Sequence, residues 1–116
     1  MSETIELSNG VFLSNAVNMG HARRKQLLVD MIATIATISD KAADREESVV
    51  FSESVELPEF PANAQEITIL QLITHGKEAA CRGEFILAEG HTIPFALFVN
   101  FKSAGNDEIV GLQFFG

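Results

Sequence analysis

Polar side chains that could bind a ligand or move a proton lie on three consecutive strand-like runs. These runs are ITILQLITH from Ile67, EAACRGEFIL from Glu78 and TIPFALFVNF from Thr92. If tight turns at Gly76-Lys77 and Glu89-Gly90 join them, alternation along the strands brings polar and apolar side chains onto one shared face. A few polar groups among apolar walls are typical of a small-molecule pocket. The sequence therefore predicts a ligand-binding site formed by Gln71, His75, Arg82, Glu84, Phe95 and Leu97.

Two interpretations of these residues are open, one catalytic and one structural. His75 with Glu78 or Glu84 could act as a general acid and base, which favours an isomerase, a dehydratase or a cyclase. Alternatively, Arg82 and Glu84 pair with each other and only support the fold. We favour the structural role for Arg82 and a mainly apolar cavity, and we assign no catalytic residue.

Metal and cofactor chemistry is not expected. His21, His75 and His91 are far apart in the sequence, and Cys81 alternates to the opposite face from His75. No zinc-ligand spacing results, and no glycine-rich phosphate loop is present. The single cysteine excludes an intramolecular disulfide, and the first residues lack the pattern of a signal peptide. We expect a cytoplasmic protein.

Composition and charge limit the partners. The chain has 116 residues, 47% of them hydrophobic, and a formal net charge of −8. This length indicates one domain over residues 1–116. A surface of that sign repels phosphate backbones and anionic lipids, so neither nucleic acid nor a membrane is an expected partner.

The elements that must position these side chains follow from hydrophobic periodicity. A helical stripe runs from about His21 to Ile38, and a second short helix is possible over 42–47. A strand over Val49–Leu57, ended by Pro58, precedes a four-strand meander with a longer loop at Lys102–Asp107. The predicted class is α+β: one or more N-terminal helices packed on a curved antiparallel sheet, as a cone-shaped, cystatin-like roll.

Both faces of the predicted sheet are largely apolar, and one helix covers one of them. The second face would be a liability in a monomer. We therefore expect a homodimer formed through the face that carries Leu72, Cys81, Phe85 and Phe98.

The segments ITHGKEAACRG, FALFVNFKSAG and EIVGLQFFG, with GHARRKQLLVDMIATIATISD upstream, resemble the nuclear transport factor two-like superfamily. This superfamily includes SnoaL-like and ketosteroid-isomerase-like proteins. The resemblance covers about residues 20–116 and leaves 1–20 as a divergent segment. It implies a cone of helices against a curved sheet around a pocket, commonly in a homodimer.

The same resemblance argues against ketosteroid-isomerase chemistry. The positions that match the family's base and its protonated acid are Leu57 and Leu97, and the chain has no tyrosine for the oxyanion hole. Related dehydratase-like members use His and Asp, but no aspartate is spaced to pair with His75. The segment PEFPANAQ is too short for the family's third helix, so either the pocket is open or residues before Met19 fold over it.

These observations favour a small-molecule-binding protein with an apolar pocket and no complete catalytic set. The expected ligand is small and apolar or weakly acidic. The acid–base enzyme described above is one alternative. A protein-interaction domain, with apolar surface exposed by the shortened lid, is the other.

Overall fold

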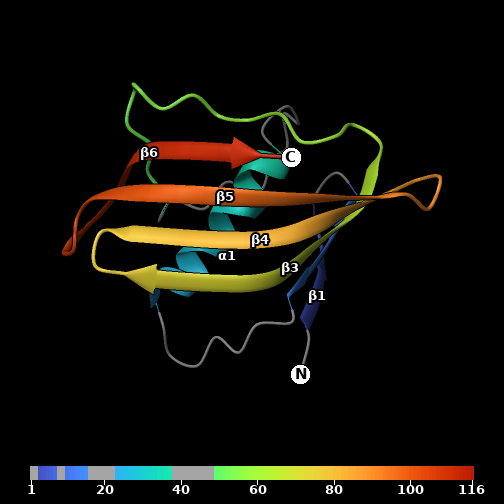
Figure 1. Cartoon of the computed structure of the whole chain (residues 1–116), viewed down its shortest axis with the longest axis horizontal. Coiled ribbons are helices and arrows are strands. Elements are labelled where there is room, and N and C mark those ends of the chain that lie inside the picture. The colour runs from blue at the N-terminus through green and yellow to red at the C-terminus, as the bar shows by residue number, and fades with distance from the viewer. Residues whose placement is uncertain (1–2, 8–9, 16–22, 38–48) are drawn as a thin grey trace.

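The structure is a computed structural model that describes residues 3–7, 10–15, 23–37 and 49–116 (Figure 1). Within these described residues, six strands form one sheet in the order β1-β2-β3-β4-β5-β6. Strands β2 and β3 are parallel, and every other neighbouring pair is antiparallel. The element bounds are β1 Glu3–Glu6, β2 Phe12–Asn15, α1 Arg23–Ala36, β3 Ala64–His75, β4 Glu78–Leu87, β5 Thr92–Ser103 and β6 Asn106–Phe115.

The predicted fold class is wrong. In place of a helical cone on an antiparallel sheet, the described residues form a mixed six-stranded sheet with one helix of 14 residues. Two strands come from residues 3–15, for which no strand is predicted from the sequence. These strands are only four residues long, which is too short for an alternating pattern to be recognised.

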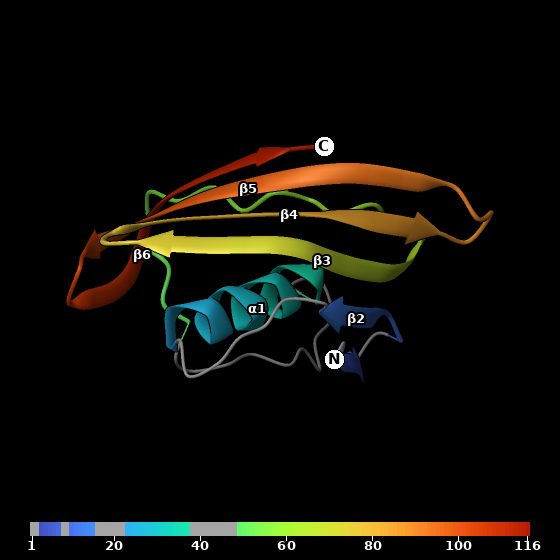
Figure 2. The same cartoon turned by 60° about the horizontal axis from the view of Figure 1, so that its bottom comes forward.

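Helix α1 lies against one face of the sheet, as Figure 2 shows. Its stripe of Leu28, Met31, Ile32 and Ile35 is buried, as the 3.6-residue period predicts. On the sheet, the inward residues Ile69, Phe85, Leu97, Phe101 and Ile109 are also almost fully buried. We call this helix-covered side of strands β3–β6 the inner face and the opposite side the outer face.

Arg24 ties the start of α1 to the turns at one end of the sheet. Its Nε donates to Asp107 Oδ1 at 2.7 Å, and its Nη atoms donate to the carbonyl oxygens of Gly76 and Ser103 at 2.9 and 3.0 Å. The guanidinium also lies 3.9 Å from the centroid of the Phe101 ring. One side chain thus joins the helix, the β3–β4 turn and the β5–β6 turn.

The predicted tight turn at Gly76-Lys77 is confirmed, whereas the turn that contains Gly90 is longer than predicted and spans residues 87–91. Both glycines have positive φ values, 58° and 91°, which residues with a Cβ rarely adopt. The predicted loop over Lys102–Asp107 is shorter than expected, because β5 extends to Ser103 and β6 begins at Asn106.

The register around the first turn agrees with the prediction. Gln71 lies opposite Arg82, and His75 opposite Glu78. An irregularity between Ile69 and Gln71 then shifts the pairing, so that Thr68, instead of Ile69, faces Glu84.

The register around the second turn differs from the prediction by one residue. Arg82 pairs with Ala96, not with Leu97, because five residues, 87–91, separate the paired Ile86 and Thr92. A slip of one residue moves every side chain of β5 to the other face. Phe95 and Leu97 are therefore on the inner face, and Ala96 and Phe98 on the outer face.

The strand predicted over Val49–Leu57 is also wrong. This segment contributes a single bridge, between Phe51 and Ile109, with two backbone hydrogen bonds of 2.8 Å along the edge of β6. The short helix considered over 42–47 lies outside the described residues. Among the described residues, no helix is long and apolar enough to cross a membrane.

Candidate functional site

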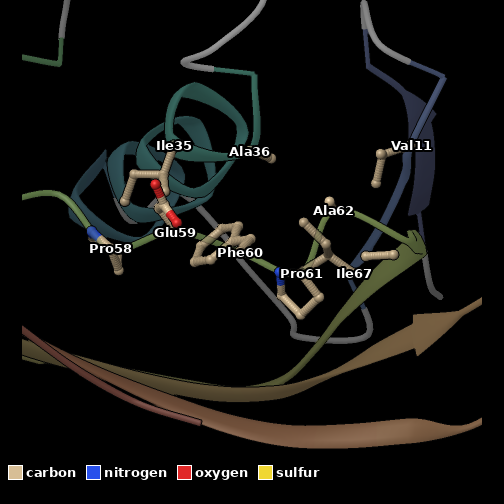
Figure 3. Close-up of a pocket in the computed structure, with 10 residues that line it drawn as sticks. Val11, Ile35, Ala36, Pro58, Glu59, Phe60, Pro61, Ala62 and Ile67 are labelled. Carbon is tan, nitrogen blue, oxygen red and sulfur yellow. The ribbon is translucent and has the colours of Figure 1, made fainter.

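A cavity of about 400 Å³ opens between the end of α1, Val11 just before β2, and the segment that leads into β3 (Figure 3). The helix contributes Ile35 and Ala36, and β3 contributes Ala64 and Ile67. The lining residues outside α1 and β3 are Val11, Pro58, Glu59, Phe60, Pro61 and Ala62.

The segment 58–62 takes this course because of its two prolines. Pro58 and Pro61 have no backbone N–H, and their fixed φ angles oppose pairing within the sheet. The chain turns at Pro61, whose carbonyl oxygen accepts a hydrogen bond of 3.2 Å from the Ala64 amide, and then enters β3. The side chain of Phe60 is thereby directed back under the sheet.

Phe60 is part of an aromatic cluster on the inner face. Its ring centroid lies 4.9 Å from that of Phe85 and 5.6 Å from that of Phe114, and Phe85 stacks on Phe95 at 4.5 Å. Aromatic pairs at these separations stabilise the fold beyond the burial of their apolar surface. The cluster therefore holds Phe60 in place. The cavity therefore has an ordered aromatic wall.

The lining is nearly free of polar side chains. Of the described residues that line the cavity, Glu59 alone carries a charge. Nothing in this part of the lining offers a nucleophile, or a base paired with an acid. The arrangement can bind an apolar body by excluding water and can meet a donor or a cation at Glu59.

The six residues predicted to form the site are divided between the two faces. Phe95 and Leu97 are buried on the inner face, while Gln71, His75 and Arg82 are exposed on the outer face. The sixth, Glu84, is half-buried on the outer face. The structure does not bring them together, because the β4–β5 register differs from the predicted one and α1 covers the opposite face.

Arg82 and Gln71 do meet on the outer face. Arg82 Nε donates to Gln71 Oε1 at 2.9 Å, and both side chains are exposed. The expected pair between Arg82 and Glu84 is not among the ion pairs of the described residues. Because the guanidinium reaches water, it needs no buried carboxylate or anionic ligand to compensate its charge.

His75 and Glu78 are cross-strand neighbours beside the β3–β4 turn, and both are exposed. They flank a shallow hollow on the outer face and are not part of the cavity lining. A general acid and base work best where water is excluded. Both side chains of this pair are exposed to water.

Cys81 lies on the inner face at 5% exposure, beneath the helix. Burial raises the pKa of its thiol to about 12, while a backbone hydrogen bond from Leu97 lowers it by less. The thiolate is the reactive form, so this cysteine is inert near neutral pH. Throughout the described ranges, no group of three His, Cys, Asp or Glu side chains could hold a metal ion.

The sequence contained partial signals for the cavity. PEFPANAQ interrupts the strand pattern with two prolines around a phenylalanine, and Val11 belongs to the apolar residues before Met19 that were considered as a cover. No family model, curated protein or solved structure matches this chain. The resemblance to the nuclear transport factor two-like superfamily stays a prediction, and the observed mixed sheet differs from the cone that it implied.

Proposed function

We propose that this protein binds a small apolar molecule in the cavity between α1, Val11 and the segment 58–62. The observation that carries the proposal is a space of about 400 Å³ whose described lining side chains are all apolar except Glu59, although polar atoms also reach its surface. Ligand sites have volumes of about 300–1,000 Å³ and combine apolar walls with a few polar groups. The acid–base alternative gains no support from the positions of His75 and Glu78.

The negative charge of Glu59 at the cavity favours a neutral or cationic ligand over an anionic one. Glu59 and the net charge of −8 both oppose an anion. A neutral molecule, or one with an ammonium group at one end, fits this lining better than the weakly acidic ligand considered from the sequence. The apolar body would lie along Phe60 and Ile35, with its polar end toward Glu59.

The proposal can be tested with N-phenyl-1-naphthylamine, a neutral probe whose fluorescence rises in apolar surroundings. About 17 non-hydrogen atoms at about 0.3 kcal/mol each give a binding free energy of about −5 kcal/mol, or a Kd of about 0.2 mM. A saturable increase in fluorescence at this Kd or a lower one is expected. The protein is titrated into a fixed low concentration of the probe, and no saturable increase at protein concentrations up to about five times the expected Kd would refute the proposal.

A cavity-filling variant locates the site. Ala62 is exposed and lines the cavity, so Ala62→Phe should fill part of the space without disturbing the core. We expect it to weaken probe binding about tenfold or more, which corresponds to about 1.4 kcal/mol. The matched control is Ala104→Phe, an exposed alanine in the β5–β6 turn, which should bind the probe as the parent protein does. Equal binding by both variants would place the probe elsewhere.

A pair of naphthalene compounds tests the preference for charge. 1-Naphthylmethylamine and 1-naphthoic acid share one apolar body and carry opposite charges near neutral pH. The amine should bind more tightly, and Glu59→Gln should reduce the difference between the two. A preference for the acid would contradict the role given to Glu59.

A further inference from the structure

The outer face of strands β3–β6 presents an apolar centre that nothing in the described part of the chain covers. Ile73 is 58% exposed, Phe98 47% and Phe115 56%. The register places Ile73, Ala80 and Phe98 in one row across the sheet, and Ala96 next to Phe115 in the adjacent row. We call these five residues the apolar centre.

Polar side chains surround this centre. His75, Glu78 and Asn100 form the row at the β3–β4 turn, and Glu84 lies toward the opposite end. Gln71 and Arg82, joined by their hydrogen bond, border the centre on one side. An apolar middle within a polar, wet rim is the usual arrangement of a protein–protein interface.

The surface of the apolar centre has a protruding aromatic ring, that of Phe98, with hollows beside it. The ring of Phe98 is fixed by an edge-to-face contact with Phe115, with ring centroids 5.8 Å apart. Beside it lie two shallow hollows of about 240 and 250 Å³, both of which include Ile73, Ala80 and Phe98 in their lining. The hollows exist because alanines occupy positions 80 and 96 between larger side chains.

We propose that the outer face is an interface between two copies of this chain, which pack sheet against sheet about a two-fold axis. In such an isologous contact, one surface must carry both the projecting group and its receptor. The apolar centre carries both, since Phe98 of each copy can enter the hollow beside Ala80 and Ala96 of the other. Arg82 and Glu84 also supply both charge signs at the polar border of the apolar centre.

The area of the face is sufficient for a dimer. Four strands spaced by about 4.8 Å, each with about ten residues at about 3.3 Å, cover about 600 Å². Two copies would bury about 1,200 Å², just inside the range of about 1,200–2,000 Å² for specific interfaces. A dimer of this size should be reversible and depend on concentration.

This interface corrects the dimer face expected from the sequence. Leu72, Cys81 and Phe85 are buried on the inner face and are unavailable to a partner, whereas Phe98 is on the exposed side. The proposal does not depend on ligand binding, because the cavity lies on the inner side of the sheet.

Sedimentation velocity on the full chain, from about 1 to about 200 µM, tests the proposal. We expect a monomer–dimer equilibrium within this range. Ile73→Glu would place a charge without a partner in the interface, and should raise the dimer Kd about 100-fold or more. Phe98→Glu should act in the same way.

The matched control is Ile5→Glu. Ile5 is 50% exposed on β1, outside the proposed interface, so this variant should have the dimer Kd of the parent protein within about twofold. Because Ile73 and Ile5 are exposed in the single chain, both variants should keep the parent circular-dichroism spectrum. A monomer at every concentration would overturn the proposal and leave the face to a different protein. A dimer unaffected by Ile73→Glu and Phe98→Glu would place the contact elsewhere, such as along the edge of β6.

Discussion

Replacing Arg24 with methionine should destabilise the fold more than any other exchange of a charged side chain discussed above. The variant removes an ion pair of 2.7 Å to Asp107, four hydrogen bonds to turn carbonyls at 2.9, 3.0, 3.1 and 3.4 Å, and the contact with the Phe101 ring. The ion pair is largely shielded, with 16% and 18% of the two side chains exposed.

The loss of stability expected for Arg24→Met follows from the burial of this ion pair. Breaking a buried ion pair by removing one partner costs about 3–5 kcal/mol, and residual exposure reduces that figure. Hydrogen bonds from a charged donor to carbonyl oxygens contribute about 1.5–3 kcal/mol each, but these contributions are not additive. We expect Arg24→Met to lower the free energy of unfolding by about 3–4 kcal/mol. This is a large part of the 5–15 kcal/mol typical of such a domain.

Urea unfolding, followed by circular dichroism at low protein concentration, measures this loss. Lys25→Met is the control, since it removes a cation from the neighbouring position of the same helix, and it should change the free energy of unfolding by less than about 0.5 kcal/mol. Arg24→Lys should recover only part of the loss, because an ammonium group cannot reproduce the planar fork of donors. A loss below about 1 kcal/mol for Arg24→Met would refute the proposed role of this residue.

Two further predictions concern the inner face. A Cβ on Gly83 would overlap the Thr68 carbonyl oxygen and lie 2.9 Å from the Phe95 ring, so Gly83→Ala should lower the urea midpoint severely. Gly105→Ala, which meets nothing within 4 Å, is its control, and equal effects of the two would contradict the packing described here. The raised pKa of Cys81, about 12 against an ordinary 9.0, predicts no reaction of the native thiol with Ellman's reagent at pH 8. The same pKa predicts that the free energy of unfolding falls between pH 9 and 12, because only the unfolded thiol releases its proton in this range. Below pH 9 the contribution of Cys81 to stability is complete. A Cys81→Ala variant whose free energy of unfolding falls equally between pH 9 and 12 would contradict this.

The parts of the fold that the sequence predicted are those with long, regular patterns. The stripe from Leu28 to Ile35 identified the helix, and the alternation over strands β3–β6, with glycines at 76 and 90, identified the meander. In these segments local propensity and the final fold agree.

The predictions of strand register were wrong where the length of a loop, by a single residue, decides which face each side chain occupies. The loop between β4 and β5 could be read with a different number of residues, and that choice alone exchanged the faces of Phe95 and Phe98. Nothing in the sequence indicated which apolar face α1 covers. The parallel pairing of β2 with β3 was also hidden, since a four-residue strand carries little pattern and its partner lies about 50 residues further along the chain.

The sequence predicts an apolar pocket on the meander, whereas the cavity of the structure has a different lining. Its lining comes from Val11, the end of α1 and the segment around Phe60, which become neighbours only in the folded chain. The polar residues that suggested a pocket instead form the rim of the outer face. Such placements depend on tertiary contacts and not on spacing.

Nuclear Overhauser effects between bound N-phenyl-1-naphthylamine and ¹³C-labelled protein would locate the ligand on one side of the sheet. Binding in the cavity predicts contacts from the probe to the methyl groups of Ile35 and to the ring of Phe60. Contacts to Ile73 and Phe98 alone would contradict the proposed ligand site, because they would place the probe on the outer face.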